Sequence, residues 1–333
     1  MHHRSPGGTG CGAESAGGGT DPAADDFVAQ CAERGEVAAH SALQFHRQYG
    51  IHSRDRTPAS DGSSDSATVA TMIPKIELGT LLFTMVEPHR GHEVEYNRWY
   101  EHDHFYSGCM VGADTFAGDR FVATKRLKSL RYPAVSPMTP DPSIGSFLAI
   151  YWVLRGRHDE WNRWSVDNVI QLHQQGRMFT ARDHIHTVLY DHAFSVQRAD
   201  NSTSIELALD RGYAGLVVNV GELADGATFD DLQAWTTTWS ESAFGTAWGP
   251  DLIGASRPLP LLDDAPADVP RVANADRRFV QLHFLDHDPE DGWADGWARF
   301  GAQLDASGVA SHLWTAPFIQ TVFGTDAYVD ELH

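Results

Sequence analysis

The sequence predicts an α+β protein in which two tandem βαββαβ units close into a single barrel. From residue 72 onward, apolar strands and amphipathic helices follow one another in the order β-α-β-β-α-β, and the same order then repeats. Local matches between the two units lie about 130 residues apart, as a duplicated unit requires. A sheet with helices on one face must cover its other face, so we expect the two sheets to pack face to face and close into a barrel.

Composition and charge limit the classes of function. The 333 residues carry a formal net charge of −20 and no basic stripe, which argues against nucleic acid or an anionic membrane surface as a partner. No apolar run is long enough to span a membrane and the first residues lack a signal pattern, so we expect a cytoplasmic protein. Cys11, Cys31 and Cys109 are odd in number and far apart, which argues against a disulfide framework or a zinc ribbon.

The composition divides the chain into three parts. Residues 1–71 are rich in Gly and Ser, lack Trp and show no sustained period, so they cannot bury enough apolar surface to offset the entropy of ordering. We therefore expect residues 1–71 to form a disordered extension. The first βαββαβ unit is expected over 72–200 and the second over 211–325.

In the first unit, apolar runs and turn residues predict four strands and two helices. In chain order, the expected elements are strand 80–86, helix 93–106, strand 120–125, strand 146–153, helix 158–174 and strand 184–190. A loop rich in proline separates the second strand from the third, and Gly156 ends the third strand.

The second unit repeats this order. The expected elements are strand 216–220, helix 229–242 with Thr228 as its N-cap, strand 252–262, an acidic loop 263–270, strand 279–285, helix 293–305 and strand 311–319. Two matches set the alignment between the units. Trp99 and Trp235 fall at the same position of the first helix, and the last strands carry His184-Ile-His-Thr187 and His312-Leu-Trp-Thr315.

The first helix carries a specific motif, Asn97-Arg-Trp-Tyr-Glu-His-Asp-His104. This stretch resembles the EthD-like branch of the dimeric α/β-barrel superfamily, whose members carry Asn/Asp-x-Trp/Tyr-Tyr-x-x-x-His on their first helix. The resemblance covers residues 80–190 by motif and 214–323 by topology. It implies two ferredoxin-like units in a single-chain pseudo-dimeric α/β barrel, with a site at the mouth of the barrel.

The resemblance also implies a range of activities. Members of the superfamily include cofactor-free oxygenases, polyketide cyclases, isomerases and lyases, and tandem relatives bind haem, so the fold does not choose the function. The motif histidine corresponds to His104, for which the resemblance implies a catalytic role. The second unit has Ser240 at this position, so we expect it to have lost the site and kept the scaffold.

The strand predicted at 184–190 carries two histidines. Because side chains alternate across a strand, His184 and His186 should share a face with Tyr190. The opposite face is more apolar and is expected to pack on the helices, which would send both histidines into the barrel. Two imidazoles placed in this way suit acid–base catalysis, a metal ion or a haem iron, so His184 and His186 are candidates for catalysis and for metal ligation.

Other side chains are expected to line the substrate cavity. On the first helix, Tyr100 lies four residues before His104 and shares its face. On strand 279–285, the polar alternate residues are expected to face the barrel, and strand 311–319 should present two further side chains inward. The expected substrate-binding residues are Tyr100, Tyr190, Gln281, His283, His312 and Trp314.

These patterns favour an enzyme that uses histidine acid–base chemistry on an apolar or aromatic molecule in the barrel cavity, as a lyase, isomerase, cyclase or cofactor-free oxygenase. One alternative is a metal- or haem-dependent enzyme with His184 and His186 as ligands, and another is a barrel that binds a small molecule without turnover. No cofactor is favoured, although a metal or haem fits the pattern. The expected partner is a small-molecule substrate, and the expected assembly is a monomer or a homodimer.

Overall fold

The computed structural model describes residues 75–259, 274 and 276–333. The extension predicted at 1–71 and the acidic loop predicted at 263–270 lie outside the described residues. Within the described ranges, no helix is both long enough and apolar enough to cross a membrane.

The observed elements follow the predicted order in both units. The first unit comprises β1 (Leu78–Pro88), α2 (Glu93–Trp99), its π-helical continuation η1 (Tyr100–Met110), β2 (Thr115–Val122), α3 (Lys125–Lys128), β3 (Phe147–Leu154), α4 (His158–Gln174) and β4 (Arg182–Gln197). The second comprises η2 (Ile205–Leu207), β5 (Gly215–Leu223), α5 (Phe229–Ala243), β6 (Leu252–Pro258), β7 (Arg278–Leu285), α6 (Trp297–Ser307), β8 (Ala310–Gln320) and η3 (Val329–Glu331).

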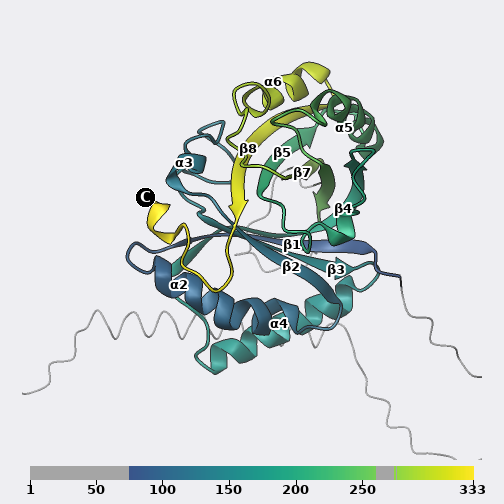
Figure 1. The fold of residues 1–333 in the computed structure, drawn as a ribbon. Coiled ribbons are helices and arrows are strands. Elements are labelled where there is room, and N and C mark those ends of the chain that lie inside the picture. The colour runs from purple at the N-terminus through teal and green to yellow at the C-terminus, as the bar shows by residue number, and fades with distance from the viewer. Residues whose placement is uncertain (1–74, 260–273, 275) are drawn as a thin grey trace, which may run out of the picture. The chain divides into compact units, whose positions relative to one another are not determined.

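The strands form one closed barrel in the order β1-β3-β2-β8-β5-β7-β6-β4. Within each unit the fourth strand pairs with the first, the first with the third and the third with the second, which is the ferredoxin-like order. Helices α2 and α4 lie on one side of the barrel, and α5 and α6 lie on the opposite side (Figure 1). The predicted fold class is therefore confirmed: the chain forms a single-chain pseudo-dimeric α/β barrel.

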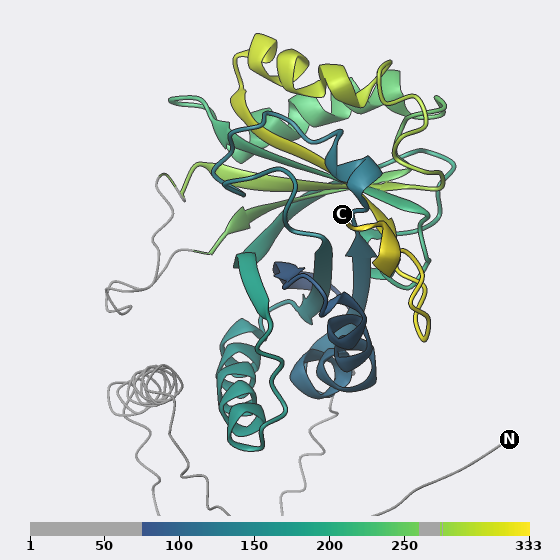
Figure 2. The same ribbon diagram turned by 90° about the vertical axis from the view of Figure 1, so that its left-hand side faces the viewer.

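The two units meet along two seams of unequal length. Strand β4 is sixteen residues long because its first part pairs with β1 and its last part, Tyr190–Gln197, pairs with β6 of the second unit. The prediction of a strand at 184–190 captured only the part that pairs with β1. At the other seam, β2 pairs with β8 only at Phe121 and Val122. Figure 2 shows the strands of both units between their two helix layers.

The inside of the barrel is a packed core. Large side chains from both units, including Phe83, Trp152, Phe284 and Trp314, belong to one apolar cluster and are almost fully buried. A cavity of about 10 Å³ lies at its edge beside His186, too small for an organic molecule. The prediction of a substrate cavity inside the barrel is therefore wrong, because alternate residues from eight strands fill the interior.

Local sequence explains the helix ends. The Thr228 side chain accepts a hydrogen bond from the Asp231 backbone N–H, and the Asp231 carboxylate accepts one from the Thr228 N–H, so the predicted N-cap of α5 is a complete capping box. The predicted helix 93–106 extends to Met110 because its last turns are π-helical. Helix α6 begins at Trp297, four residues later than predicted, after turns that contain Gly292 and Gly296.

Candidate functional site

A β-bulge in β4 separates the two histidines of the last strand of the first unit. Met85 pairs with His186, whereas the next residue, Val86, pairs with His184, so Ile185 has no partner across the ladder. Neighbouring residues of β1 point to opposite faces of the sheet, and their partners do the same. His184 therefore points toward the helices and His186 into the barrel. The prediction that both point inward is wrong for His184, because the bulge adds one residue to the alternation.

The helix-side face of β4 carries a short hydrogen-bond chain. His184 Nδ1 and Thr187 Oγ1 lie 2.9 Å apart, and Thr187 Oγ1 lies 2.9 Å from Thr84 Oγ1 on β1. The Nε2 atom of His184 lies 3.3 Å from a guanidinium nitrogen of Arg182. His184 and Thr187 are exposed, so this face of the sheet is only partly covered by α2 and α4.

His186 belongs to the barrel core. Its Nε2 lies 2.9 Å from the hydroxyl of Tyr190, and its ring meets Phe83 edge to face at 5.8 Å. Burial, followed by the charge of Arg278, lowers the pKa of His186 to about 4. Because His184 and His186 lie on opposite faces of one sheet, they cannot both bind one metal or haem iron. Among the described residues, no group of three His, Cys, Asp or Glu side chains is placed to hold a metal ion.

The second unit repeats the bulge at the matched position. Val220 pairs with Trp314, and Gly221 pairs with His312, so Trp314 points into the barrel and His312 toward the helices. His312 Nε2 lies 2.7 Å from Thr315 Oγ1, which donates to the side chain of Asn219. The inward orientation predicted for Trp314 is confirmed. The one predicted for His312 is wrong for the same reason as for His184.

Strand β7 also has the opposite orientation to the predicted one. Gln281 and His283 point toward α5 and α6 instead of into the barrel. Gln281 donates to Thr236 Oγ1 at 2.8 Å, and both are fully buried. His283 is enclosed by the rings of Trp239 and Trp297, and neither ring nitrogen has a hydrogen-bond partner among the described residues. These two residues are therefore part of the packed second helix layer.

The helix motif forms a cluster of rings beneath the first sheet. His104 stacks on Trp99 with ring centres 4.5 Å apart and an interplanar angle of 16°, and it meets the edge of Tyr100 at 5.2 Å. The predicted shared face of Tyr100 and His104 is thus observed. The hydroxyl of Tyr100 lies 2.9 Å from the hydroxyl of Tyr151 on β3, which ties the helix to the sheet.

The electrostatics of this cluster keep its imidazoles neutral. Burial, followed by the positive charge of Arg182, lowers the pKa of His104 to about 3. Partial desolvation and Arg182 lower the pKa of His184 to about 4. The guanidinium of Arg182 lies 5.0 Å above the ring of Trp99. The site therefore combines two neutral imidazoles and a cation around one indole.

The position of Gly108 explains how His104 is held. A Cβ at residue 108 would lie 2.7 Å from the imidazole, so only glycine lets the ring pack against the helix. The Nδ1 atom of His104 is buried and has no hydrogen-bond partner among the described residues. Its Nε2 makes no hydrogen bond within the described part of the chain, so this nitrogen is available to a ligand.

The corresponding positions of the second unit are buried and inaccessible to a ligand. Leu82 is half-buried and Thr187 exposed on the first sheet, whereas their counterparts Val217 and Thr315 are fully buried. Thr236 and Ser240 occupy the places of Tyr100 and His104 in the alignment, and both are buried. Among the described residues, the helix-side face is thus more accessible in the first unit than in the second.

Three members of the cluster were not among the predicted site residues: Trp99, Tyr151 and Arg182. Arg182 lies two residues before His184, which is a weak signal, because exposed arginines are common at strand ends. Tyr151 lies in a strand, Phe147–Leu154, whose residues are all apolar in character, so its sequence context indicates only burial. The ring contacts between Trp99 and His104 depend on the π-helical geometry, which the sequence did not predict.

No protein-family model matches the sequence, and no curated protein matches it. Solved structures show a remote likeness. One is an anthrone oxidase-like protein, with a TM-score of 0.42 and 9% identity over 74% of this chain and 92% of that one. A dye-decolorizing peroxidase from Bacteroides thetaiotaomicron gives 0.38 and 9% over 77% and 96%. A variant of chlorite dismutase from Candidatus Nitrospira defluvii gives 0.39 and 9% over 77% and 96%. The fold assignment rests on the strand order above.

Proposed function

We propose that this protein is an enzyme that removes a proton from a small aromatic or apolar molecule and returns it at another atom or to the same one. The substrate would lie against the accessible helix-side face of β1 and β4. His104 would be the base, and Arg182 with His184 would stabilise the anion that forms. The observation that carries the proposal is the neutral imidazole of His104 stacked on Trp99, with the Arg182 guanidinium above the same indole.

The protonation states support this assignment of roles. With its proton on Nδ1, neutral His104 offers the Nε2 lone pair to an acidic C–H or O–H group. The low pKa of His104 has Arg182 as its second cause after burial. A negative charge that develops on the substrate offsets the field of Arg182, so the imidazolium becomes more favourable as the proton is transferred.

The surrounding side chains would bind and orient the substrate. Trp99 stacks on His104 and lies beneath Arg182, so its partly exposed edge would contact an aromatic ring of the substrate. Burial raises the pKa of Tyr100 and of Tyr151 well above the usual value, so both phenols stay protonated. Of the two hydroxyls, one donates to the other, and this hydrogen bond fixes Tyr100 against the edge of the His104 ring. Isomerases, cyclases, lyases and cofactor-free oxygenases can all share this first deprotonation.

The test uses exchange of a substrate proton with solvent, which does not require the natural substrate. The protein is incubated with 2-tetralone, an aromatic ketone, in D₂O, and loss of the α-proton signal is followed by NMR. We expect exchange above the buffer rate, and His104→Gln should reduce the catalysed rate by roughly 10²-fold or more. Arg182→Gln should also reduce it, because the enolate loses its cation.

Two matched histidines serve as controls. His312→Gln changes the second-unit counterpart of His184, and His186→Gln changes the imidazole inside the barrel. Both variants should retain exchange. Equal loss in His104→Gln and His312→Gln would contradict the assignment of the site. Quenching of tryptophan fluorescence by 2-tetralone without any exchange would instead favour a barrel that binds small molecules without turnover.

A further inference from the structure

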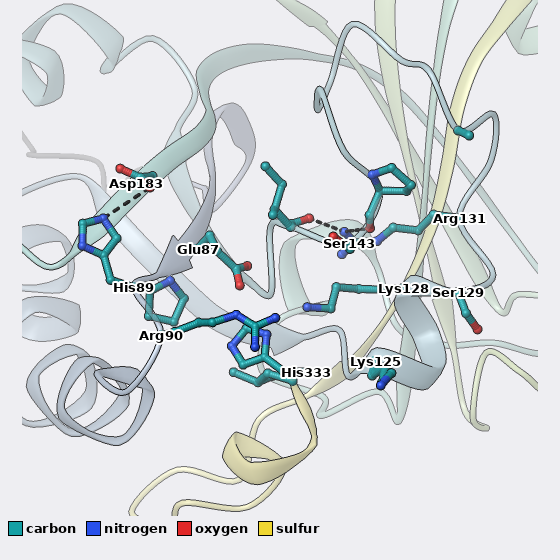
Figure 3. Close-up of a pocket in the computed structure, with 15 residues that line it drawn as sticks. Glu87, His89, Arg90, Lys125, Lys128, Ser129, Arg131, Ser143, Asp183 and His333 are labelled. Carbon is teal, nitrogen blue, oxygen red and sulfur yellow. Dashed lines mark hydrogen bonds and ion pairs between the residues drawn. The ribbon is translucent and has the colours of Figure 1, made fainter.

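A second candidate site is a cavity that lies away from His104. Its volume is about 680 Å³, and it opens where β1 ends, β4 begins and α3 follows β2 (Figure 3). Its wall includes Pro88, Asp183 and the loop around Ile144, whereas His104, Arg182 and His184 do not line it. The carboxylates and cations of this cavity come from segments far apart in the chain, so no local motif indicates the site.

The cavity is positively charged in a strongly acidic protein. Four cationic side chains line it, against two carboxylates, while the whole chain has a net charge of −20. The four cations are Arg90, Lys125, Lys128 and Arg131, and the carboxylates are Glu87 and Asp183. Such a local excess of positive charge attracts anions that the rest of the surface repels.

Two of the four cations are enclosed. Lys128 is only 5% exposed; its Nζ donates to Ser146 Oγ at 2.9 Å and has two further hydrogens to donate. Arg131 is also 5% exposed and donates to backbone carbonyls of the loop, including those of Ile144 and Gly145. Its Nε is buried without a hydrogen-bond partner among the described residues. Burial lowers the pKa of both cations, and the charge of Glu87 opposes that shift in each, so a single buried carboxylate serves two enclosed cations and a bound anion would stabilise them further.

The other two cations are exposed at the rim and available. Within the described part of the chain, neither Arg90 nor Lys125 forms an ion pair. The carboxylate of Asp183 is taken by His89, at 3.3 Å, and that of Glu87 accepts the Ser146 backbone N–H at 2.7 Å. The acidic groups of the cavity are therefore engaged with neighbours, while the rim cations face open space.

We propose that this cavity binds a small organic anion, through a phosphate or carboxylate group held by Arg90, Lys125 and Lys128. Charged donors on separate segments suit an oxyanion with several acceptor oxygens. The apolar side chains of Pro88, Ile144 and Leu332 would contact the organic part, and the volume greatly exceeds what an inorganic ion needs. This ligand site is distinct from the proposed catalytic cluster and goes beyond its function.

The test is isothermal titration calorimetry of the full chain at low ionic strength with phenyl phosphate, benzoate and inorganic phosphate. We expect at least one of the two organic anions to bind more tightly than inorganic phosphate. Its affinity should fall as salt is added. A preference for phenyl phosphate would identify a phosphomonoester, and a preference for benzoate a carboxylate. Binding of inorganic phosphate as tight as that of both organic anions, or no binding of any of the three, would overturn the proposal.

Variants locate the binding. The double variant Arg90→Gln with Lys125→Gln changes exposed side chains only. It should lower the affinity for the preferred anion by roughly tenfold or more. Arg163→Gln, an exposed change on α4, should leave the affinity unchanged, and so should His104→Gln, which separates this site from the proposed catalytic one. Unchanged affinity in the double variant would show that the anion binds elsewhere.

Discussion

At the scale of single residues, the same pair of side chains lies in two environments. His184 contacts Thr187 where both are exposed, whereas His312 contacts Thr315, which is fully buried. The surroundings make the difference, because the rings of Tyr132 and of Phe300 on α6 lie beside His312. An imidazole on the accessible face can meet a ligand, while one within the packed layer serves only to complete the packing.

His283 makes a clear prediction about pH. Burial among aromatic rings lowers the pKa of His283 to about 3, from 6.5. An imidazole whose pKa is lowered by folding contributes stability above the unfolded pKa, and this stability is lost as the pH falls from about 6.5 toward 3, by about 1.4 kcal/mol per pH unit. We therefore expect His283→Leu to lose less stability between pH 7 and pH 5 than the unchanged protein, measured by urea denaturation.

The measurement at pH 8 is the control for that variant. The imidazole is neutral there in both folded and unfolded chains, so the two proteins differ only in the packing against Trp239 and Trp297. Parallel stability curves from pH 8 to pH 5 would show that His283 is not the group that titrates.

At the scale of elements, the sequence predicted much of the fold but not which face of each strand is inward. The order of strands and helices followed from runs of apolar residues, and α4 was predicted with its observed bounds, His158–Gln174. The faces could not be predicted because both sides of each sheet are covered, one by helices and the other by the second sheet. A contrast between apolar and polar faces, which assigns orientation in a half-exposed sheet, is then missing.

The candidate site shows the same division. The contact between Tyr100 and His104 followed from their spacing of four residues, and it is observed. The orientation of His184 depended on a bulge that exists only through the pairing of β4 with β1. The local sequence of the strand does not indicate such a bulge. The opposite orientations of His184 and His186 could therefore not be predicted from that sequence alone.

The segment after β8 supports the first helix. The Gly324 N–H donates to Glu101, the carbonyl of Thr325 accepts from Asn97, and Leu332 is buried. A chain that ends at Phe323 should melt at a temperature lower by roughly 5 °C or more, because apolar burial and these hydrogen bonds are lost together. Differential scanning calorimetry measures the change.

A single substitution is the control for this truncation. Arg98→Ala removes only an exposed ion pair with Asp326, which contributes little, and should shift the melting temperature far less. Equal melting temperatures for the truncated and the complete chain would show that the final segment does not stabilise the helix.

At the scale of the whole molecule, neither unit can cover its own sheet. The inner-face residues of the first unit, such as Phe83 and Trp152, pack in one cluster with Phe284 and Trp314 of the second. Residues 72–200 expressed alone should therefore aggregate or pair with a second copy through the exposed apolar face. Light scattering coupled to size-exclusion chromatography measures the mass; a soluble, folded monomer would contradict this dependence.

The unequal lengths of the two seams suggest the order in which the barrel forms during folding. The long β4–β6 seam joins segments that are near each other in the chain, so it can form as soon as β6 is available. The β2–β8 seam is short and joins strands almost two hundred residues apart, as Phe121 pairs with Gln320. We therefore expect ring closure to be the last step of folding, with the highest entropic cost. The same two-residue seam is where the closed ring opens most easily, so amide hydrogens next to it should exchange with solvent before those of β4 and β6.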